Sequence, residues 1–394
     1  RLPSLSGSTS LSAHSDANVM TQVVDIRNAD DPRDVIHRSV QLLADGELVA
    51  LATESGYVLA AHLLNADAVQ RLVSLSPDSK PFSRQLAIKS AQEVQDYVQN
   101  LSRLGTKLTR RYWPGPVAIV LRVEQAQGLF EAVSSETRSA LIDADRCGFR
   151  VPADDVFREV LRLSQAPLVV ATEHRSDSQS TMVRQASDIT DLYGDDVAMV
   201  VDNGPSRYDQ PAPIVEIENE RWKCIRPGVV NETTLSRLAS EVYLFVCTGN
   251  TCRSPMAEGW FRKLLSQRLK CNEDDLVDHG YLVTSAGLAA AFGSSASPES
   301  VSVAAEHDID LHAHESRPLT DQMLDQADHI YTMTRGHRNS ILSIRPDLAD
   351  TVSVLSPDGG DVPDPIGFGL DEYKNCEKKI KESVRLIVDQ LPSP

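Results

Sequence analysis

One segment past the middle of the chain constrains the fold more than any other. The apolar run at residues 242–246 leads directly into Cys247-Thr-Gly-Asn-Thr-Cys-Arg253-Ser254, and Pro255 follows. Proline suits the first turn of a helix, because its missing N–H would have no partner there. The segment therefore predicts a strand, a tight loop and a helix, with the loop on the helix N-terminus. In parallel sheets ligands bind beyond the carboxyl ends of the strands, so a site is expected at this loop.

The chain after residue 241 repeats this alternation of strand and helix. Strands are predicted at 242–246, 281–285, 330–333 and 352–355, and helices at 255–269, 298–306, 336–344 and 371–391. Strands that alternate with helices of this length are typical of right-handed βαβ units. We therefore expect residues 241–394 to form a four-stranded, parallel, doubly wound sheet.

The first half of the chain also mixes the two kinds of pattern. Strands are predicted at 49–51, 117–121, 168–171, 197–201 and 214–217, and helices at 34–44 and 92–101. We expect a separate α/β domain at residues 23–238. Residues 1–22 are rich in serine and lack an apolar block, so we expect a disordered leader there.

Length and charge limit the functions that the chain can have. A chain of 394 residues favours two domains. Its formal net charge of -17 argues against a general affinity for nucleic-acid backbone. Six cysteines in so long a chain do not form a disulfide framework, which favours a reducing compartment and a cytoplasmic protein. No apolar run is long enough to cross a membrane, and no membrane partner is expected.

The residues of the loop fit cysteine-dependent phosphate chemistry. Successive backbone N–H groups at a helix N-terminus bind anions, and Gly249 allows the backbone to approach a phosphate. The same helix end and a nearby cation favour the thiolate of Cys247, which is the nucleophilic form. Arg253 can hold two phosphoryl oxygens with its planar fork. Ser254 can donate a hydrogen bond to the sulfur.

Covalent catalysis through a phosphocysteine also needs an acid for the leaving group. Asp364 is the candidate, because it lies between two prolines in a loop after the last predicted strand. Asp361 and Asp358 are alternatives by residue type. The chemistry requires neither a metal nor an organic cofactor, and none is expected.

Residues 242 to about 391 resemble the low-molecular-weight protein tyrosine phosphatase family throughout. The resemblance rests on the loop from Cys247 to Glu258, on Ser285-Ala-Gly287 and on Asp364-Pro365. It implies that the loop cysteine is the nucleophile, that the loop arginine binds phosphate and that the aspartate is the general acid. The resemblance extends the phosphate-binding loop to Thr248, Gly249, Asn250, Thr251, Cys252 and Ser254.

Thr251 refines the expected substrate, which is a phosphorylated protein. Family members that act on phosphotyrosine commonly have an aliphatic residue at this position and aromatic residues after the Asp-Pro pair, where this chain has Ile366 and Gly367. The sequence of the loop resembles the bacterial protein-arginine-phosphatase branch instead. We therefore expect phosphoarginine or phosphotyrosine as the substrate, with phosphoarginine preferred, and Phe368 could still supply an aromatic wall.

Several other interpretations stay open. Cys252 is either structural or a redox partner of Cys247. A relative of this fold is an arsenate reductase, but Cys271 and Cys376 show no evident shuttle arrangement. His312 and His314 have a spacing seen in metal sites, yet no second pair accompanies them, so a solvated loop is expected. Helix patterning places His337 on a helix surface.

Residues 23–230 resemble the YrdC-type family, the threonylcarbamoyl-AMP synthases of tRNA modification. The resemblance rests on five motifs: 51–57, 112–116, Arg150-Val-Pro, 212–216 and Arg226-Pro-Gly. It implies a twisted α/β sheet with a concave cleft for ATP and threonine.

The cleft motifs of that family are eroded in this chain. The residues that correspond to nucleotide-binding positions are Thr53, Lys80 and Thr172, but Asp78 replaces a cation and Glu173 adds a carboxylate. We expect a scaffold or a binding module, with a nucleotide or RNA as a possible ligand. The alternative is a threonylcarbamoyl-AMP synthase or a nucleotide- or RNA-binding protein of tRNA modification with an accessory phosphatase.

Overall fold

The computed structural model describes residues 21–76, 81–123, 129–172 and 183–391. Two compact units divide the chain between Asn231 and Glu232. The sequence placed this division after residue 238, so the short helix α8 (Glu232–Ala239) belongs to the second unit and not to the first. The expected leader at 1–22 lies outside the described residues up to residue 20, and strand β1 already begins at Gln22.

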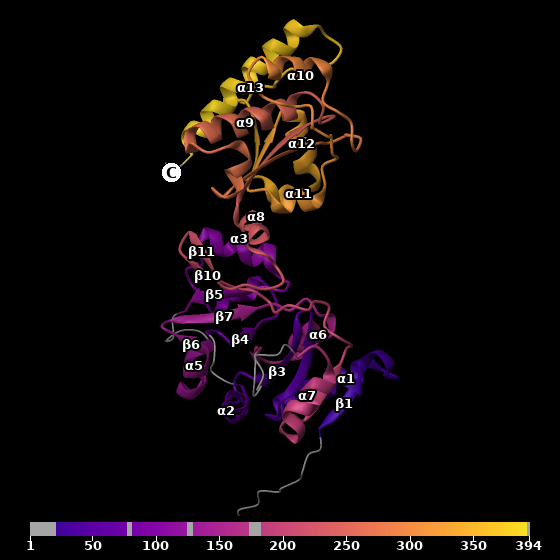
Figure 1. Ribbon diagram of the computed structural model, residues 1–394, viewed down its shortest axis with the longest axis vertical. Coiled ribbons are helices and arrows are strands. Elements are labelled where there is room, and N and C mark those ends of the chain that lie inside the picture. Colours follow the sequence, from indigo (N-terminus) through magenta and orange to yellow (C-terminus); the bar gives the residue numbers. More distant parts are fainter. Residues whose placement is uncertain (1–20, 77–80, 124–128, 173–182, 392–394) are drawn as a thin grey trace, which may run out of the picture. The chain divides into compact units, whose positions relative to one another are not determined.

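Within the described residues of the first unit, eleven strands form one mixed sheet (Figure 1). Ten of them run in the order β1-β9-β2-β3-β8-β4-β7-β5-β10-β11, and β6 pairs with β7. The strands are β1 (Gln22–Asp25), β2 (Val49–Thr53), β3 (Gly56–His62), β4 (Arg84–Ala87), β5 (Ala118–Arg122), β6 (Ile142–Asp143), β7 (Arg146–Arg150), β8 (Leu168–Ala171), β9 (Met199–Asp202), β10 (Ile214–Glu218) and β11 (Arg221–Arg226).

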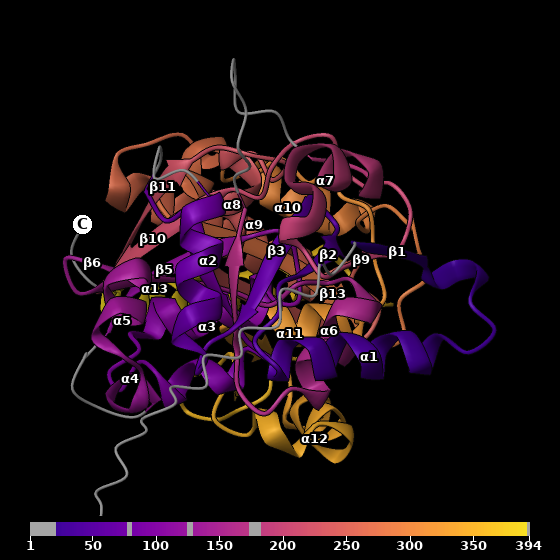
Figure 2. The same ribbon diagram turned by 90° about the horizontal axis from the view of Figure 1, so that it is seen from below.

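The helices of this unit pack their apolar sides on the sheet. They are α1 (Pro32–Ala44), α2 (Ala66–Leu75), α3 (Arg103–Tyr112), α4 (Leu129–Ala132), α5 (Ser135–Leu141), α6 (Asp155–Leu163) and α7 (Ala186–Tyr193), with short 3₁₀ helices at Ile26–Asn28, Gln92–Asp96 and Gly194–Asp196. Helices α1 and α6 lie side by side and share one core cluster with strands β2, β3, β8 and β9 (Figure 1, Figure 2). The α/β class predicted for this unit is confirmed.

One predicted helix of the first unit is wrong in kind and in length. Residues 92–101 form only the 3₁₀ helix η2 (Gln92–Asp96). The chain leaves the helix at Tyr97, whose buried ring packs against Phe130 and Phe149. Contacts with residues far along the chain therefore end the helix that the local pattern predicted to continue.

The second unit is the predicted four-stranded parallel sheet, in the order β13-β12-β14-β15. Its strands are β12 (Glu241–Cys247), β13 (Tyr281–Gly287), β14 (His329–Thr332) and β15 (Val352–Val354). Its helices are α9 (Arg253–Leu269), α10 (Pro298–Ala305), α11 (Asp321–Gln326), α12 (Arg335–Ile344) and α13 (Leu370–Gln390), with 3₁₀ helices at Glu273–Val277 and Pro346–Leu348. Helix α11 was not predicted.

Side chains of β12 alternate between two cores, as a doubly wound sheet requires. Tyr243, Phe245 and Cys247 face a cluster built with α9, α10 and α13. Leu244 and Val246 face the other cluster, which includes residues of α11 and α12. Figure 1 shows α9 and α13 running beside each other. Cys247 is thus the last residue of a central strand, at the carboxyl edge of the sheet and on the side of α9.

Candidate active site

The sulfur of Cys247 lies inside a shell of hydrogen-bond donors. Ser254 Oγ is 3.0 Å from Sγ, and the backbone N–H of Asn250 donates to Sγ at 3.2 Å. Ser254 Oγ accepts from the Asn250 amide at 2.9 Å, and its own hydrogen has two acceptors within reach, the sulfur at 3.0 Å and the Ala286 carbonyl at 3.4 Å. The start of α9 at Arg253 adds the positive end of a helix dipole. These donors can hydrogen-bond a thiolate, which is the form that attacks phosphorus.

Asn250 holds the loop in shape through its side chain. The residue is fully buried and has a φ of +55°, in the left-handed region that asparagine tolerates better than most residues. Its Nδ2 donates to Ser254 Oγ and to Ser285 Oγ, each at 2.9 Å. Its Oδ1 accepts from the backbone N–H of Arg317 at 2.9 Å. Both ends of the Asn250 amide are therefore bonded within the protein, and the side chain supports the loop. The assignment of Asn250 to the phosphate-binding loop stays a prediction.

Two further contacts extend this network. Ser285 at the end of β13 donates to Glu258 Oε2 on α9 at 2.6 Å. His314 Nε2 lies 2.7 Å from the backbone oxygen of Asn250. His314 lies in a loop, as predicted, but it is half-buried rather than solvated, whereas His312 is exposed and pairs with Asp310. The sequence pointed to these residues through motifs and spacing, but not to these contacts, because the partners are far apart along the chain.

Arg253 and Asp364, the predicted cation and acid, lie together. Arg253 is 4% exposed, and its Nη2 contacts the Asp364 carboxylate. Its Nη1 donates to the Val362 carbonyl at 3.3 Å. The Asp364 side chain is 42% exposed, which leaves it accessible to a leaving group. The carboxylate of Asp364 is thus a counter-ion of Arg253.

The alternative acids have other roles. Asp361 Oδ1 accepts from the backbone N–H of Arg335 at the start of α12, at 2.8 Å. Asp358 accepts from Ser356 Oγ and from the Gly360 N–H, and these bonds lower the pKa of Asp358. Both carboxylates therefore organise loops, whereas Asp364 lies against Arg253.

Thr248 carries a contact that the sequence did not indicate. Its Oγ1 lies 3.3 Å from Arg253 Nη2 and 2.9 Å from His337 Nε2 on α12. His337 lies on α12, as predicted, but its side chain is half-buried rather than freely exposed on the helix surface. Burial, and next the charge of Arg253, lower the pKa of His337 below its usual value, against the opposite effect of Asp364 and Asp361.

Glycine is needed behind the loop, at Gly287, and not at Gly249 within it. A Cβ on Gly249 would meet only Thr251 Oγ1, at 3.5 Å, so the protein itself leaves room there. A Cβ on Gly287, at the end of β13, would lie 2.6 Å from the Thr248 carbonyl oxygen and 2.9 Å from the Asn250 nitrogen. Gly287 therefore permits the phosphate loop to pack on the neighbouring strand.

Cys252 has structural contacts. Its sulfur lies 3.4 Å from Ser297 Oγ and 3.6 Å from the Tyr373 hydroxyl. All six cysteines of the chain are free thiols in the structure, so a disulfide between Cys247 and Cys252 stays a prediction. Burial raises the pKa of Cys376 to about 12 and also raises that of Cys271, which disfavours the thiolates that an arsenate-reducing shuttle needs.

Two of the predicted nucleotide-binding residues of the first unit have hydroxyl groups that bond the protein's own backbone. Thr53 Oγ1 donates to the Gly56 carbonyl at 2.7 Å within a tight turn. Thr172 Oγ1 donates to the Ser83 carbonyl at 2.9 Å. Lys80 lies outside the described residues. Both described hydroxyl groups are therefore engaged by the protein's own backbone.

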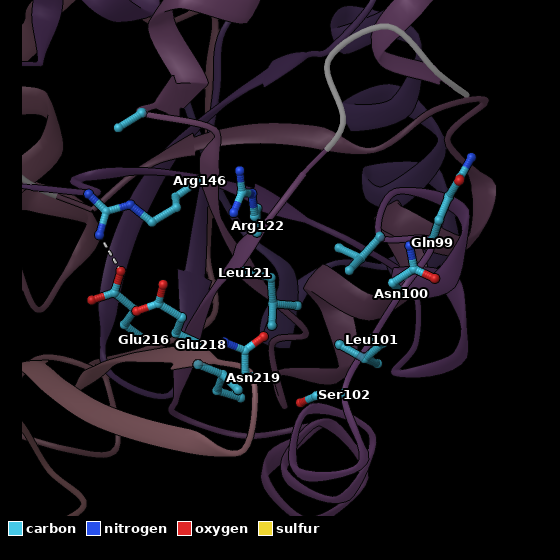
Figure 3. A pocket seen from close by; sticks show the side chains of 13 residues that line it. Gln99, Asn100, Leu101, Ser102, Leu121, Arg122, Arg146, Glu216, Glu218 and Asn219 are labelled. Carbon is cyan, nitrogen blue, oxygen red and sulfur yellow. Dashed lines mark hydrogen bonds and ion pairs between the residues drawn. The ribbon is translucent and has the colours of Figure 1, made fainter.

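A pocket of about 490 Å³ lies elsewhere in the first unit (Figure 3). Figure 3 shows the Arg146–Glu216 ion pair on one side and Gln99 and Asn100 on the other. Neither Thr53 nor Thr172 lines it. In the part of the chain that the structure describes, no group of three or more His, Cys, Asp or Glu residues could hold a metal ion. Nor is any helix among the described residues both long enough and apolar enough to span a bilayer.

Comparisons with known proteins divide the chain in the same way. Residues 242–393 match the family model of low molecular weight phosphotyrosine protein phosphatases, and residues 41–228 match the Sua5, YciO and YrdC model, described as telomere recombination. The protein-arginine-phosphatase of Bacillus subtilis is 38% identical over 152 residues, which are 38% of this chain and 95% of that protein.

Two more relatives cover one unit each. A putative threonylcarbamoyl-AMP synthase of Methanocaldococcus jannaschii is 26% identical over 212 residues, 53% of this chain and 93% of that protein. A probable low molecular weight protein-tyrosine-phosphatase of Ralstonia nicotianae is 32% identical over 149 residues, 38% of this chain and 94% of that protein. The chain therefore belongs, through its second unit, to the low-molecular-weight phosphotyrosine protein phosphatase family, and it carries a YrdC-like domain as a separate unit.

Proposed function

We propose that the second unit hydrolyses the phosphoramidate bond of phosphoarginine in proteins, through a phosphocysteine at Cys247. One observation carries the chemistry: Ser254 and the Asn250 N–H surround the sulfur, at 3.0 and 3.2 Å. Arg253 and Asp364 lie in contact with each other beside the same loop. Nucleophile, anion-binding fork and acid are the three groups that this reaction needs.

The reaction proceeds in two displacements. The Cys247 thiolate attacks phosphorus, the S–P bond forms, and the P–N bond to the guanidine breaks while Asp364 gives its proton to that nitrogen. Water then attacks the phosphocysteine, Asp364 takes the proton of the water, and the S–P bond breaks. Ser254 donates to the departing sulfur, so phosphate leaves and the thiolate is restored. Substrate binding replaces the carboxylate of Asp364 by phosphoryl oxygens at Arg253.

The preference for phosphoarginine rests on Thr251. Its hydroxyl is polar and half-buried, 3.6 Å from the Cys252 sulfur. A hydroxyl can bind a guanidinium group or a water beside the P–N bond, whereas an aliphatic side chain can only pack on an aromatic ring. The similarity to the arginine phosphatase of Bacillus subtilis supports the same choice. Ile366 and Phe368 follow Asp364 in the same loop and are 62% and 64% exposed. A larger substrate could contact them there.

The decisive experiment compares two substrates on two proteins. The wild type and Thr251→Ile are assayed with matched peptides that carry phosphoarginine or phosphotyrosine. We expect the wild type to favour phosphoarginine and Thr251→Ile to shift the ratio of kcat/KM toward phosphotyrosine. Cys247→Ser should abolish turnover of both peptides and still bind inorganic phosphate. An unchanged ratio removes Thr251 as the selector, and turnover by Cys247→Ser removes the covalent mechanism.

For the first unit we infer a scaffold that has kept the outline of its family. The internal hydrogen bonds of Thr53 and Thr172 support this reading. Buried Arg150 lies 3.7 Å from the buried carboxylate of Glu54, so that cation is partly neutralised. Calorimetry of the full chain with ATP and threonine tests the inference. Tight binding of ATP would favour a nucleotide-binding module instead.

A further inference from the structure

The Thr248 hydroxyl is approached by nitrogen atoms from two sides. Arg253 Nη2 lies 3.3 Å from Thr248 Oγ1, and His337 Nε2 lies 2.9 Å from the same atom. A guanidinium group can only donate, so Oγ1 uses one lone pair to accept from Arg253. What the hydroxyl does with its hydrogen depends on the histidine.

The surroundings of the His337 ring decide which nitrogen carries the proton. Nδ1 is buried and has no hydrogen-bond partner among the residues that the structure describes. A buried N–H without an acceptor is rarer in proteins than a buried lone pair without a donor. Burial and the Arg253 charge keep the pKa of His337 low, so the ring is neutral near pH 7. A neutral ring with its proton on Nε2 donates to Thr248 Oγ1 and leaves only a lone pair at Nδ1.

With both lone pairs of Oγ1 engaged, the hydrogen of the Thr248 hydroxyl points away from Arg253 and His337. Thr248 is exposed and follows the nucleophile directly. A phosphoryl oxygen held by Arg253 Nη2 lies next to Oγ1, because these two atoms are already 3.3 Å apart. We propose that Arg253 and His337 together fix the Thr248 hydroxyl as a hydrogen-bond donor to the phosphoryl group of the substrate, with His337 as its positioning residue.

This assignment rests on the proposed phosphatase function, since it adds a donor to the same phosphoryl group. It changes the meaning of the hydrogen bond between Thr248 and His337. The bond orients a hydroxyl instead of merely anchoring α12 to the loop. The role requires an N–H at the position of Nε2 and a hydroxyl at residue 248, and no other feature of either side chain.

A double-mutant cycle on the full chain tests the assignment. The variants are Thr248→Val, His337→Phe and the double variant, with Thr248→Ser and His337→Gln as conservative replacements. Inorganic phosphate binding is measured by calorimetry, and kcat/KM with a phosphomonoester. We expect each single loss to weaken phosphate binding about tenfold, the magnitude of a lost hydrogen bond to a charged group. The double variant should lose no more than either single variant, and Ser and Gln should stay within about threefold of the wild type.

Ser340→Ala, on the exposed side of the same helix, is the matched control and should leave phosphate binding unchanged. Thermal unfolding shows whether each variant is folded. If His337→Phe does not fold, the phosphate affinity of His337→Gln tests the role of the histidine instead. Additive losses would overturn the proposal, because they show that the two side chains act separately. The proposal would also be overturned if Thr248→Val bound phosphate as the wild type does but had a shifted pH profile of kcat/KM. The hydroxyl would then act on Asp364 and not on the phosphoryl group. Phosphate binding needs no turnover, so failure of the proposed catalysis is seen separately.

Discussion

His314 Nε2 lies 2.7 Å from the backbone oxygen of Asn250, although 64 positions separate the two residues in the chain. The contact connects the loop after α10 with the phosphate-binding loop. The Asn250 side chain adds bonds to Ser254, to Ser285 and to the backbone of Arg317. One buried residue therefore joins the phosphate loop to β13 and to the segment that follows α10.

Substitution of Asn250 separates backbone strain from lost hydrogen bonds. Both Asn250→Ala and Asn250→Gly remove the two bonds of Nδ2, whereas only alanine is strained at a φ of +55°. We expect both variants to lose at least about tenfold in kcat/KM. Asn250→Ala should in addition unfold with about 1 kcal/mol less free energy than Asn250→Gly. Urea unfolding and steady-state kinetics measure the two effects. Full activity of Asn250→Gly would show that loop conformation alone matters.

Gly287→Ala should damage the site without touching a catalytic group. Its Cβ would lie 2.6 Å from the Thr248 carbonyl oxygen, and a backbone atom cannot move aside without displacing the loop. We expect a loss of about 1–3 kcal/mol in the free energy of unfolding and weaker phosphate binding. Gly369→Ala is the control, because a Cβ there meets nothing within 4 Å. Equal behaviour of the two variants would contradict the packing argument.

Asp364→Asn should lower turnover most for substrates whose leaving group must be protonated as it departs. The loss is expected to be on the order of a hundredfold for a poor leaving group and smaller for a good one. A series of aryl phosphates of different leaving-group pKa measures this dependence. Asp358→Asn is the comparison, since that carboxylate bonds Ser356 and Gly360. A uniform loss across the series for Asp364→Asn would remove it from the acid role.

The stability of the first unit should depend on pH through His62. This residue ends β3, is 9% exposed, and burial lowers its pKa from the ordinary value of 6.5. Below about pH 6.5 the unfolded chain binds a proton that the folded chain does not. The contribution of His62 to the free energy of unfolding is therefore complete above that pH. It is lost as the pH falls toward the lower pKa that His62 has in the folded chain.

Urea unfolding between pH 7 and pH 5 measures this slope. His62→Gln should reduce it, because the variant has no proton to take up there. His37→Gln changes an exposed histidine on α1 and should leave the slope as it is. If His62→Gln kept the full slope, another group would be responsible for it.

Sequence patterns predicted the second unit well because it repeats one simple motif, a strand followed by a helix. The apolar strands 242–246 and 330–333 and the helices after them lie close to their predicted bounds. The first unit was predicted less completely. Strand β4 contains the buried polar residues Arg84 and Gln85, so its pattern does not look like that of a buried strand. Its partners, β7 and β8, are distant in the sequence.

The site shows the same limit. The phosphate loop and Asp364 could be found because each has a local motif. His314 and His337 became part of the site only through partners 64 and 89 positions away. Ser285 stood in a motif, but its bond to Asn250, 35 positions away, could not be predicted from it. A single histidine in a polar helix or loop has no local signature that distinguishes these contacts from solvent exposure. Long-range topology supplies that information.

The bonds of Asn250 have a consequence for the nascent chain. The Asn250 side chain finds Ser285 and the Arg317 backbone only when β13 and the segment after α10 have reached the loop, and both are made later in synthesis than the cysteine. Until then nothing from these segments holds the residue at its positive φ. The shape of the loop around Cys247 is therefore completed only when the last of these segments has been added to the fold.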